Sequence, residues 1–146
     1  MQTFLPTPDF ATSARWLDRR RLGKQRLEAL QILRGLRGYT QGWNNHPAVQ
    51  QWRGYEAALA QYGLACCAEW TARGYIDNMA PLLRALQSTL EPAVLPPWLG
   101  DARLHASHRA ALLAKDYAWY SQFGWSESPG IDYYWPSKDP IYATTP

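Results

Sequence analysis

The stretch RWLDRRRLGKQRLEALQILRGLR, residues 15–37, dominates both the fold and the charge of this chain. It holds eight of the fifteen Lys and Arg residues against two acids, Asp18 and Glu28. On an ideal helix, at about 100° per residue, its apolar and polar residues separate onto opposite sides. The apolar side comprises Leu22, Ala29, Leu30, Leu33 and Leu36, and the polar side includes Arg21, Lys24, Glu28 and Gln31. The stretch therefore predicts an amphipathic helix with one carboxylate in a basic face.

The positive charge of the chain is local. Residues 1–37 carry eight bases against three acids, whereas residues 38–146 carry seven bases against nine acids, so the net charge of +3 comes from the first quarter. Lys24 and Glu28, spaced i and i+4, could form an ordinary exposed ion pair. One acid cannot neutralise the cations around it, which are Arg19, Arg20, Arg21, Lys24 and Arg26. Such a surface attracts polyanions, of which nucleic acid is the usual one.

The rest of the chain predicts an all-α protein, with residues 1–146 forming a single domain. Helices are expected from about residue 13 to 35 or 38, and over about 47–74, 77–90 and 102–123, followed by an irregular aromatic tail. No strand pattern competes. Thr12 or Ser13 could cap the first helix, and Asn44, Asn45 or His46 the second. At 47% hydrophobic residues, a packed core is expected.

Neither a membrane span nor a signal peptide is expected. No apolar run approaches the roughly 18 residues that a span requires. The start, MQTFLPTPDF, lacks a basic region followed by an apolar one. We therefore expect a cytoplasmic monomer.

The thiols and imidazoles give little indication of a metal site. Cys66 and Cys67 are adjacent within a predicted helix, which suits core thiols better than a disulfide or a metal cluster. His105 and His108 are spaced i and i+3, but no third ligand is obvious. We predict no metal.

Aromatic residues crowd the C-terminal third. Among them are Trp119 and Tyr120 of the segment WYSQFG, residues 119–124. Core packing accounts for most such rings, while rings beside a basic surface could instead stack on an unpaired base.

Several segments together resemble the pyrimidine-dimer DNA glycosylases of the phage endonuclease V type. These are LDRRRLGKQRLEAL at 17–30, NHP at 45–47, Glu69 followed by RGY at 73–75, GD at 100–101, the H-x-A segment at 108–110, and WYSQFG at 119–124. Their order and spacing follow the family over most of the chain. The resemblance implies a compact helical fold that acts on double-stranded DNA carrying a damaged or modified base, with no metal or organic cofactor.

The resemblance also implies a mechanism and its residues. The α-amine at the start of the chain attacks C1′ of the damaged nucleoside, the base leaves, and the resulting Schiff base permits β-elimination. An ordinary α-amine pKa of about 7.7–8.0 leaves a useful neutral fraction near pH 7. The essential Glu falls on Glu28. The phosphate contacts fall on Arg19, Arg20, Arg21, Lys24 and Arg26, with His46, Trp119 and Tyr120 also at the DNA surface. For His46, helix capping or a hydrogen bond is the alternative role.

The chain departs from the phage pattern near the proposed nucleophile. Gln2 follows Met1 where the phage enzyme has a small Thr, so the amine is that of Met1, or of Gln2 if Met1 is removed. Lys24 is a third candidate. Leu27 and Gln31 stand where the family has arginines. A non-catalytic DNA-binding domain and a protein-interaction domain with a basic helix remain as alternatives.

Overall fold

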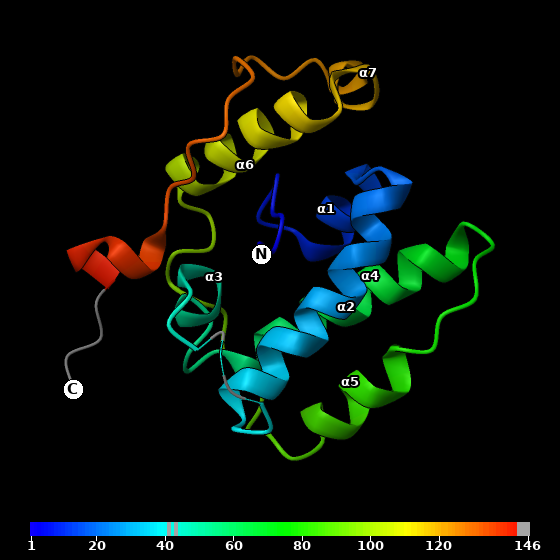
Figure 1. Cartoon of the computed structure of the whole chain (residues 1–146), viewed down its shortest axis with the longest axis vertical. Helices are drawn as coiled ribbons and strands as arrows, with labels where there is room; N and C mark the ends of the chain where they lie inside the picture. Colours follow the sequence, from blue (N-terminus) through cyan, green and yellow to red (C-terminus); the bar gives the residue numbers. More distant parts are fainter. Residues whose placement is uncertain (41, 43, 143–146) are drawn as a thin grey trace.

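The computed structural model describes residues 1–40, 42 and 44–142, and every regular element within them is helical (Figure 1). The α-helices are α1 (Phe10–Trp16), α2 (Arg19–Leu36), α3 (Pro47–Gln50), α4 (Glu56–Ala72), α5 (Ala80–Gln87), α6 (Ala102–Lys115) and α7 (Tyr117–Tyr120). Three 3-10 helices follow, η1 (Ser121–Phe123), η2 (Pro136–Lys138) and η3 (Pro140–Tyr142). The predicted all-α fold is confirmed. In this part of the chain, no helix combines the length and the apolar character needed to cross a membrane.

The basic helix begins later than its sequence suggested. Asp18 caps α2, its side chain accepting a hydrogen bond from Arg21 N, and a separate helix α1 precedes it with Asp9 as its cap. Thr12 and Ser13 lie inside α1, so the prediction that one of them caps the basic helix was wrong. Leu17 and Asp18 are extended, which turns the chain between the two helices. This turn brings the carboxylate of Asp18 to the start of α2.

The helix predicted over residues 47–74 is in fact two. The short α3 begins at Pro47 with His46 at its cap, and α4 begins only at Glu56. Between them Gly54 has φ +88°, a left-handed conformation that ends a helix and that glycine adopts without strain. The helix predicted over 102–123 is also interrupted, because Asp116 leaves the helical conformation and caps α7.

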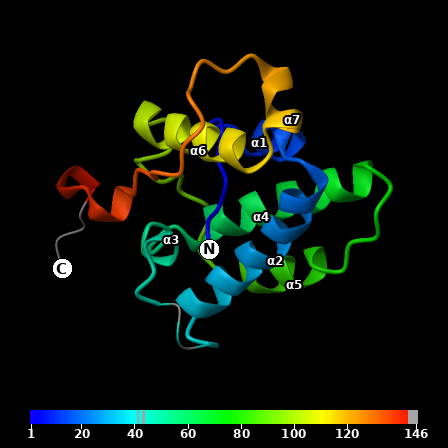
Figure 2. The ribbon, with the colours of Figure 1, turned by 45° about the horizontal axis from the view of Figure 1, so that its top comes forward.

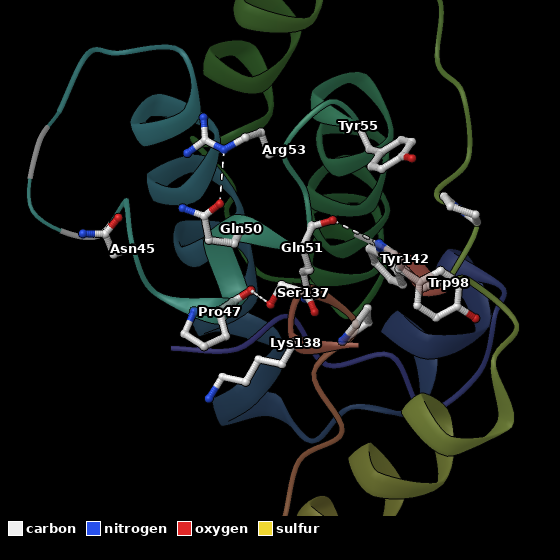
Figure 3. Close-up of a pocket in the computed structure, with 12 residues that line it drawn as sticks. Asn45, Pro47, Gln50, Gln51, Arg53, Tyr55, Trp98, Ser137, Lys138 and Tyr142 are labelled. Atoms are coloured by element: carbon white, nitrogen blue, oxygen red, sulfur yellow. Dashed lines mark hydrogen bonds between the residues drawn. The ribbon is translucent and has the colours of Figure 1, made fainter. Parts of the chain in front are cut away.

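Helix α4 lies at the centre of the bundle, in contact with α1, α2 and α5 (Figure 2). Gly63 lets α2 and α4 approach closely, since a Cβ there would lie 3.0 Å from the Cβ of Ala29. Away from this helix contact, η2 lies beside α3, where the Ser137 hydroxyl donates to Pro47 O at 3.3 Å (Figure 3).

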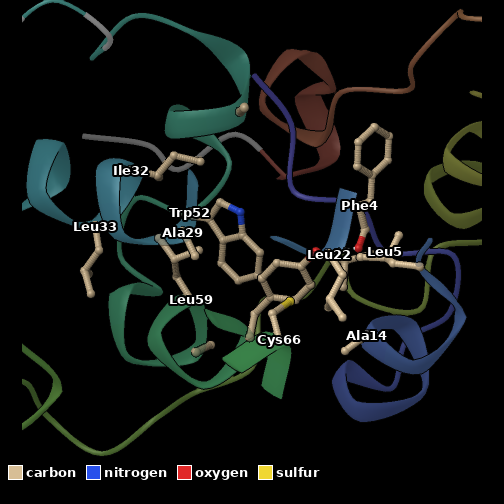
Figure 4. Packing of buried hydrophobic residues seen from close by; sticks show 14 of the residues in the cluster. Phe4, Leu5, Ala14, Leu22, Ala29, Ile32, Leu33, Trp52, Leu59 and Cys66 are labelled. Atoms are coloured by element: carbon tan, nitrogen blue, oxygen red, sulfur yellow. Dashed lines mark hydrogen bonds between the residues drawn. The ribbon is translucent and has the colours of Figure 1, made fainter. Parts of the chain in front are cut away.

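The buried apolar side chains form one cluster that extends along the chain from Phe4 to Tyr120 (Figure 4). Trp52 and Tyr62 are fully buried within it, and the Trp52 ring meets that of Trp98 edge-on at 4.9 Å. Cys66 and Cys67 are buried and unpaired, and burial raises the pKa of each to about 12. They are the core thiols that the sequence predicted.

Candidate active site

The N-terminal strap, residues 2–5, crosses the interior of the molecule without being helical. All four of its residues are buried, and it lies between α2, α4 and α6 (Figure 1). Buried backbone groups need hydrogen-bond partners. Side chains of the surrounding helices bind the backbone of Gln2, Phe4 and Leu5, and Gln2 Oε1 accepts from Thr3 N at 2.9 Å. Thr3 is held through its hydroxyl, which accepts from Gln51 Nε2 at 3.1 Å and from Trp52 Nε1 at 3.0 Å.

Gln25 of α2 and Tyr62 of α4 hold the middle of the strap. Gln25 Oε1 accepts from Phe4 N at 2.8 Å, and Gln25 Nε2 donates to Gln2 O at 2.9 Å. The Tyr62 hydroxyl lies 2.7 Å from Phe4 O and 2.6 Å from Gln25 Oε1, and these two acceptors share its single proton. Burial raises the pKa of Tyr62 well above its ordinary value, so the hydroxyl keeps the proton that it donates.

His105 and His108 of α6 hold Leu5 from the other side. His108 Nδ1 accepts from Leu5 N at 2.9 Å. His105 Nδ1 lies 2.7 Å from Leu5 O and donates to it, because its Nε2 accepts from Gly100 N. Burial lowers the pKa of both imidazoles, that of His108 to about 3. The i, i+3 pair thus binds the backbone of the strap.

Glu28 meets the start of the strap. Its Oε2 accepts from Gln25 Nε2 at 3.0 Å and from Gln2 N at 3.4 Å. Among the described residues, Glu28 takes part in no ion pair, so the i, i+4 pair with Lys24 is not formed. The carboxylate is half-buried, one turn of helix from Lys24, beside the first backbone nitrogen of the strap.

A pocket of about 490 Å³ opens in front of Glu28 and Gln2. It is lined by Met1, Gln2, Phe4, Arg20, Arg21, Lys24, Gln25, Glu28, Lys115, Ile131 and Tyr133. The structure therefore brings together the predicted catalytic residues and three of the five predicted phosphate contacts. Sequence reasoning missed Lys115 and Tyr133, which reach the pocket from α6 and the tail, and no local motif marks either of them.

The basic residues of α2 differ in how freely they can meet a phosphate. Arg20 and Lys24 are exposed, and no ion pair engages either within the described residues. Arg21 is paired with Asp18 at 3.1 Å. The Arg19 guanidinium lies over the ring of Tyr75, 5.2 Å from its centroid.

Two residues expected at the DNA surface are placed elsewhere. The Arg26 side chain is 12% exposed, forms an ion pair with Asp77 and covers the ring of Trp70, so its charge is already matched. Tyr120 is fully buried, with its hydroxyl donating to the Asp18 carboxylate. Tyr120 therefore belongs to the core, and Arg26 to a side-chain cluster behind the basic face. Both assignments correct the expectation from sequence, because pattern alone does not reveal which polar groups are matched internally.

Trp119 lines a second pocket that adjoins the first. This pocket, of about 720 Å³, shares Arg20 and Lys24 with the Glu28 pocket and also includes Leu27 and Trp70. Trp119 is 36% exposed, and its Nε1 donates to Trp16 O. An apolar, aromatic surface thus continues from the basic one.

His46 lies near the start of the chain. Its Nδ1 accepts from Ala48 N at the beginning of α3, as the capping alternative predicted. Burial lowers its pKa, and the charge of the N-terminal amine lowers it further, whereas Glu28 raises it. His46 thus lies within electrostatic range of the amine and the carboxylate, and its ring meets that of Trp135 edge-on at 5.9 Å.

Another pocket, of about 360 Å³, lies between α3, Trp98 and the C-terminal 3-10 helices (Figure 3). Arg53 and Lys138 are its only charged lining residues among those described. No carboxylate lines it, within the same residues, to assist proton transfer. The Glu28 pocket, which combines a carboxylate with an amine and several cations, is the better candidate for catalysis.

Comparison with known protein families matches residues 1–81 to the pyrimidine dimer DNA glycosylases. The chain belongs to the pyrimidine dimer DNA glycosylase family. The match covers more than half of the chain and includes the strap, Gln25, Glu28 and His46. In this family member the remaining wall of the pocket, with Lys115 and Tyr133, comes from outside the matched region. No curated protein and no solved structure matched the chain.

Proposed function

We propose that this family member is a DNA glycosylase with abasic-site lyase activity, which excises a damaged or modified pyrimidine through an imine formed by the amine at the start of the chain. A pyrimidine dimer is the substrate that the family name favours. The observation that carries the proposal is the contact between Gln2 N and Glu28 Oε2 at the wall of a basic pocket.

The first chemical step is displacement of the base. The neutral amine attacks C1′, the C1′–N1 bond breaks, and its electron pair leaves with the base, which then takes up a proton. The amine loses a proton, its lone pair forms the C1′=N bond as the C1′–O4′ bond breaks, and O4′ takes up a proton, which gives the ring-opened iminium. The carboxylate of Glu28 would stabilise the positive charge that develops on the sugar and the imine, and would accept and return the protons.

The second step is β-elimination. A base removes a proton from C2′, the imine accepts the electrons, and the C3′–O3′ bond breaks with the phosphate as leaving group. Hydrolysis of the imine then frees the enzyme. Arg20 and Lys24, which are exposed on the pocket wall, would hold the phosphates. For C1′ to reach the amine, the nucleotide must leave the stack, so distortion of the duplex is part of the proposal.

The identity of the amine follows from whether Met1 is retained. Met1 lines the pocket, but within the described residues no ion pair joins its amino group to Glu28. Removal of Met1 would turn Gln2 N, 3.4 Å from Glu28 Oε2, into the amine. A large residue after Met1 normally leaves Met1 in place, so we propose the Met1 amine first and the Gln2 amine second. Lys24 is the third.

Borohydride trapping tests the proposal. The purified protein is incubated with duplexes that carry an ultraviolet dimer or an abasic site, reduced, and digested for peptide mapping by mass spectrometry. We expect an adduct on the first residue of the chain with both duplexes. A protein with a short N-terminal extension, which moves the amine away from Glu28, is the matched control.

Three other outcomes would contradict part or all of the proposal. An adduct on Lys24 would reassign the nucleophile. An adduct with the abasic duplex alone would exclude the dimer as substrate. Salt-sensitive DNA binding without an adduct on either duplex would leave a non-catalytic DNA-binding domain.

A further inference from the structure

We infer that Gln25 is the positioning residue of this site, holding the Glu28 carboxylate at a set place relative to the start of the chain. The inference rests on the proposed function. Gln25 has no free polar group to offer a substrate, because its amide is fully engaged by protein atoms. It would act through Glu28.

The side chain of Gln25 joins the two halves of the site. Its Nε2 donates to Glu28 Oε2 at 3.0 Å and to Gln2 O at 2.9 Å. One amide group thus binds both the carboxylate and the backbone that carries the amine. A change in either contact would alter the distance between them.

The orientation of this amide is fixed by its other partners. Gln25 Oε1 accepts from Phe4 N at 2.8 Å and from the Tyr62 hydroxyl at 2.6 Å. An amide has two N–H donors and an oxygen with two lone pairs, so all of its hydrogen-bonding capacity is used. The opposite orientation would set its oxygen against the Glu28 carboxylate and its NH₂ against Phe4 N–H.

Because these hydrogen bonds are buried, losing one of them is costly. Gln25 is 1% exposed, and Phe4 and Tyr62 are also buried, so water cannot replace a lost partner at little cost. If Gln25 only anchored the strap, its bonds to Gln2 and Phe4 would suffice. The bond to Glu28 is the additional one. The pH dependence of a charged variant reports on it, because Glu28 is the one carboxylate among the hydrogen-bond partners of Gln25.

Gln25→Glu tests the inference because it keeps the shape of the side chain and replaces NH₂ by oxygen. Two carboxylates about 3 Å apart cannot both ionise readily and would share a proton. When protonated, the introduced carboxyl can still donate one hydrogen bond, whereas its ionised form repels Glu28. We therefore expect single-turnover cleavage of an abasic duplex to fall by about 100-fold at pH 8. The ratio of variant to native rate should fall as pH rises from 5.5 to 8.

Two further variants separate positioning from folding. Gln61→Glu makes the same substitution at an exposed site on α4, outside the Glu28 pocket and the Trp119 pocket, and should leave the rate and its pH dependence unchanged. Tyr62→Phe removes a hydroxyl that supports both the strap and Gln25 Oε1. Phe4 N still donates to Gln25 Oε1 in this variant and keeps the NH₂ group directed at Glu28. Tyr62→Phe should lower the melting temperature with no more than a few-fold loss of rate.

The outcomes are distinct. The inference would be overturned if the cleavage rate of Gln25→Glu fell only as far as its lower melting temperature explains, and if the ratio of its rate to the native rate did not change with pH. A loss of rate in Tyr62→Phe equal to that in Gln25→Glu would overturn it as well. If the native protein and Gln25→Glu cleaved the duplex and formed the adduct equally well, the positioning role of Gln25 would be overturned and the proposed function would stand. Absence of an adduct in the native protein would overturn the proposed function and this inference with it.

Discussion

His108 makes the stability of this protein depend on pH in a way that can be worked out from the structure. The imidazole is fully buried, and its Nδ1 accepts a hydrogen bond from Leu5 N. Protonation would replace that acceptor with a donor facing another donor. Burial, with a smaller contribution from neighbouring His105, lowers the pKa of His108 from 6.5 to about 3.

The sign and size of the effect follow from linkage. Below pH 6.5 the unfolded chain binds a proton at His108 that the folded chain does not, so the free energy of unfolding falls as pH falls from 6.5 toward 3. One such proton is worth about 1.4 kcal/mol per pH unit. Between about pH 7.5 and pH 5, His108 should therefore cost about 2 kcal/mol of stability.

Urea unfolding followed by tryptophan fluorescence at pH 7.5 and pH 5.0 measures this cost. His108→Asn keeps an acceptor near the position of Nδ1 and does not titrate. Its loss of stability between the two pH values should be about 2 kcal/mol smaller than that of the native protein. His46→Asn makes the same substitution at the half-buried cap of α3, where burial also lowers the imidazole pKa, and serves as the comparison for a less buried histidine. Equal losses in His108→Asn and the native protein would refute the assignment of a neutral, buried acceptor.

Three further variants test the site and the packing beneath it. Glu28→Gln should abolish strand cleavage and leave DNA affinity equal or higher, because it removes a negative charge from a basic pocket; cleavage at the native rate would exclude the proposed mechanism. Lys24→Ala should reduce the slope of log K against log salt by about one, as measured by fluorescence anisotropy, since Lys24 is exposed and without an ion pair among the described residues. Gly63→Ala should lower the free energy of unfolding by about 1–3 kcal/mol, because its Cβ would lie 2.9 Å from Leu83 Cδ1 and 3.0 Å from Ala29 Cβ. An unchanged free energy of unfolding in urea would show that α2 and α5 can move away from α4 to make room for the added methyl group.

The local pattern of residues was enough to predict the basic helix and the two faces it presents. Leu22, Ala29, Leu30 and Leu33 are buried as their spacing predicted, and Lys24 and Gln31 are exposed. Helix periodicity reports which side of a helix is apolar, and this property depends only on neighbours along the chain. Glu28 stood out for the same reason, as one acid in a basic face.

Helix ends were predicted less well, because one residue can stop a helix whose apolar pattern continues. The sequence predicted one helix over residues 47–74, yet Gly54 turns the chain between α3 and α4. Asp18 and Asp116 act similarly, each capping a new helix where the pattern suggested a single one.

What the sequence by itself determined is the helical class, the basic face and the presence of Glu28 within it. Only the tertiary structure decided that the start of the chain is buried, because its partners lie far along the sequence. Leu5 is bound by His105 and His108, about one hundred residues away, and Phe4 by Gln25 and Tyr62. A buried, non-helical backbone must find its hydrogen bonds wherever the fold supplies them, and no local pattern records where that will be.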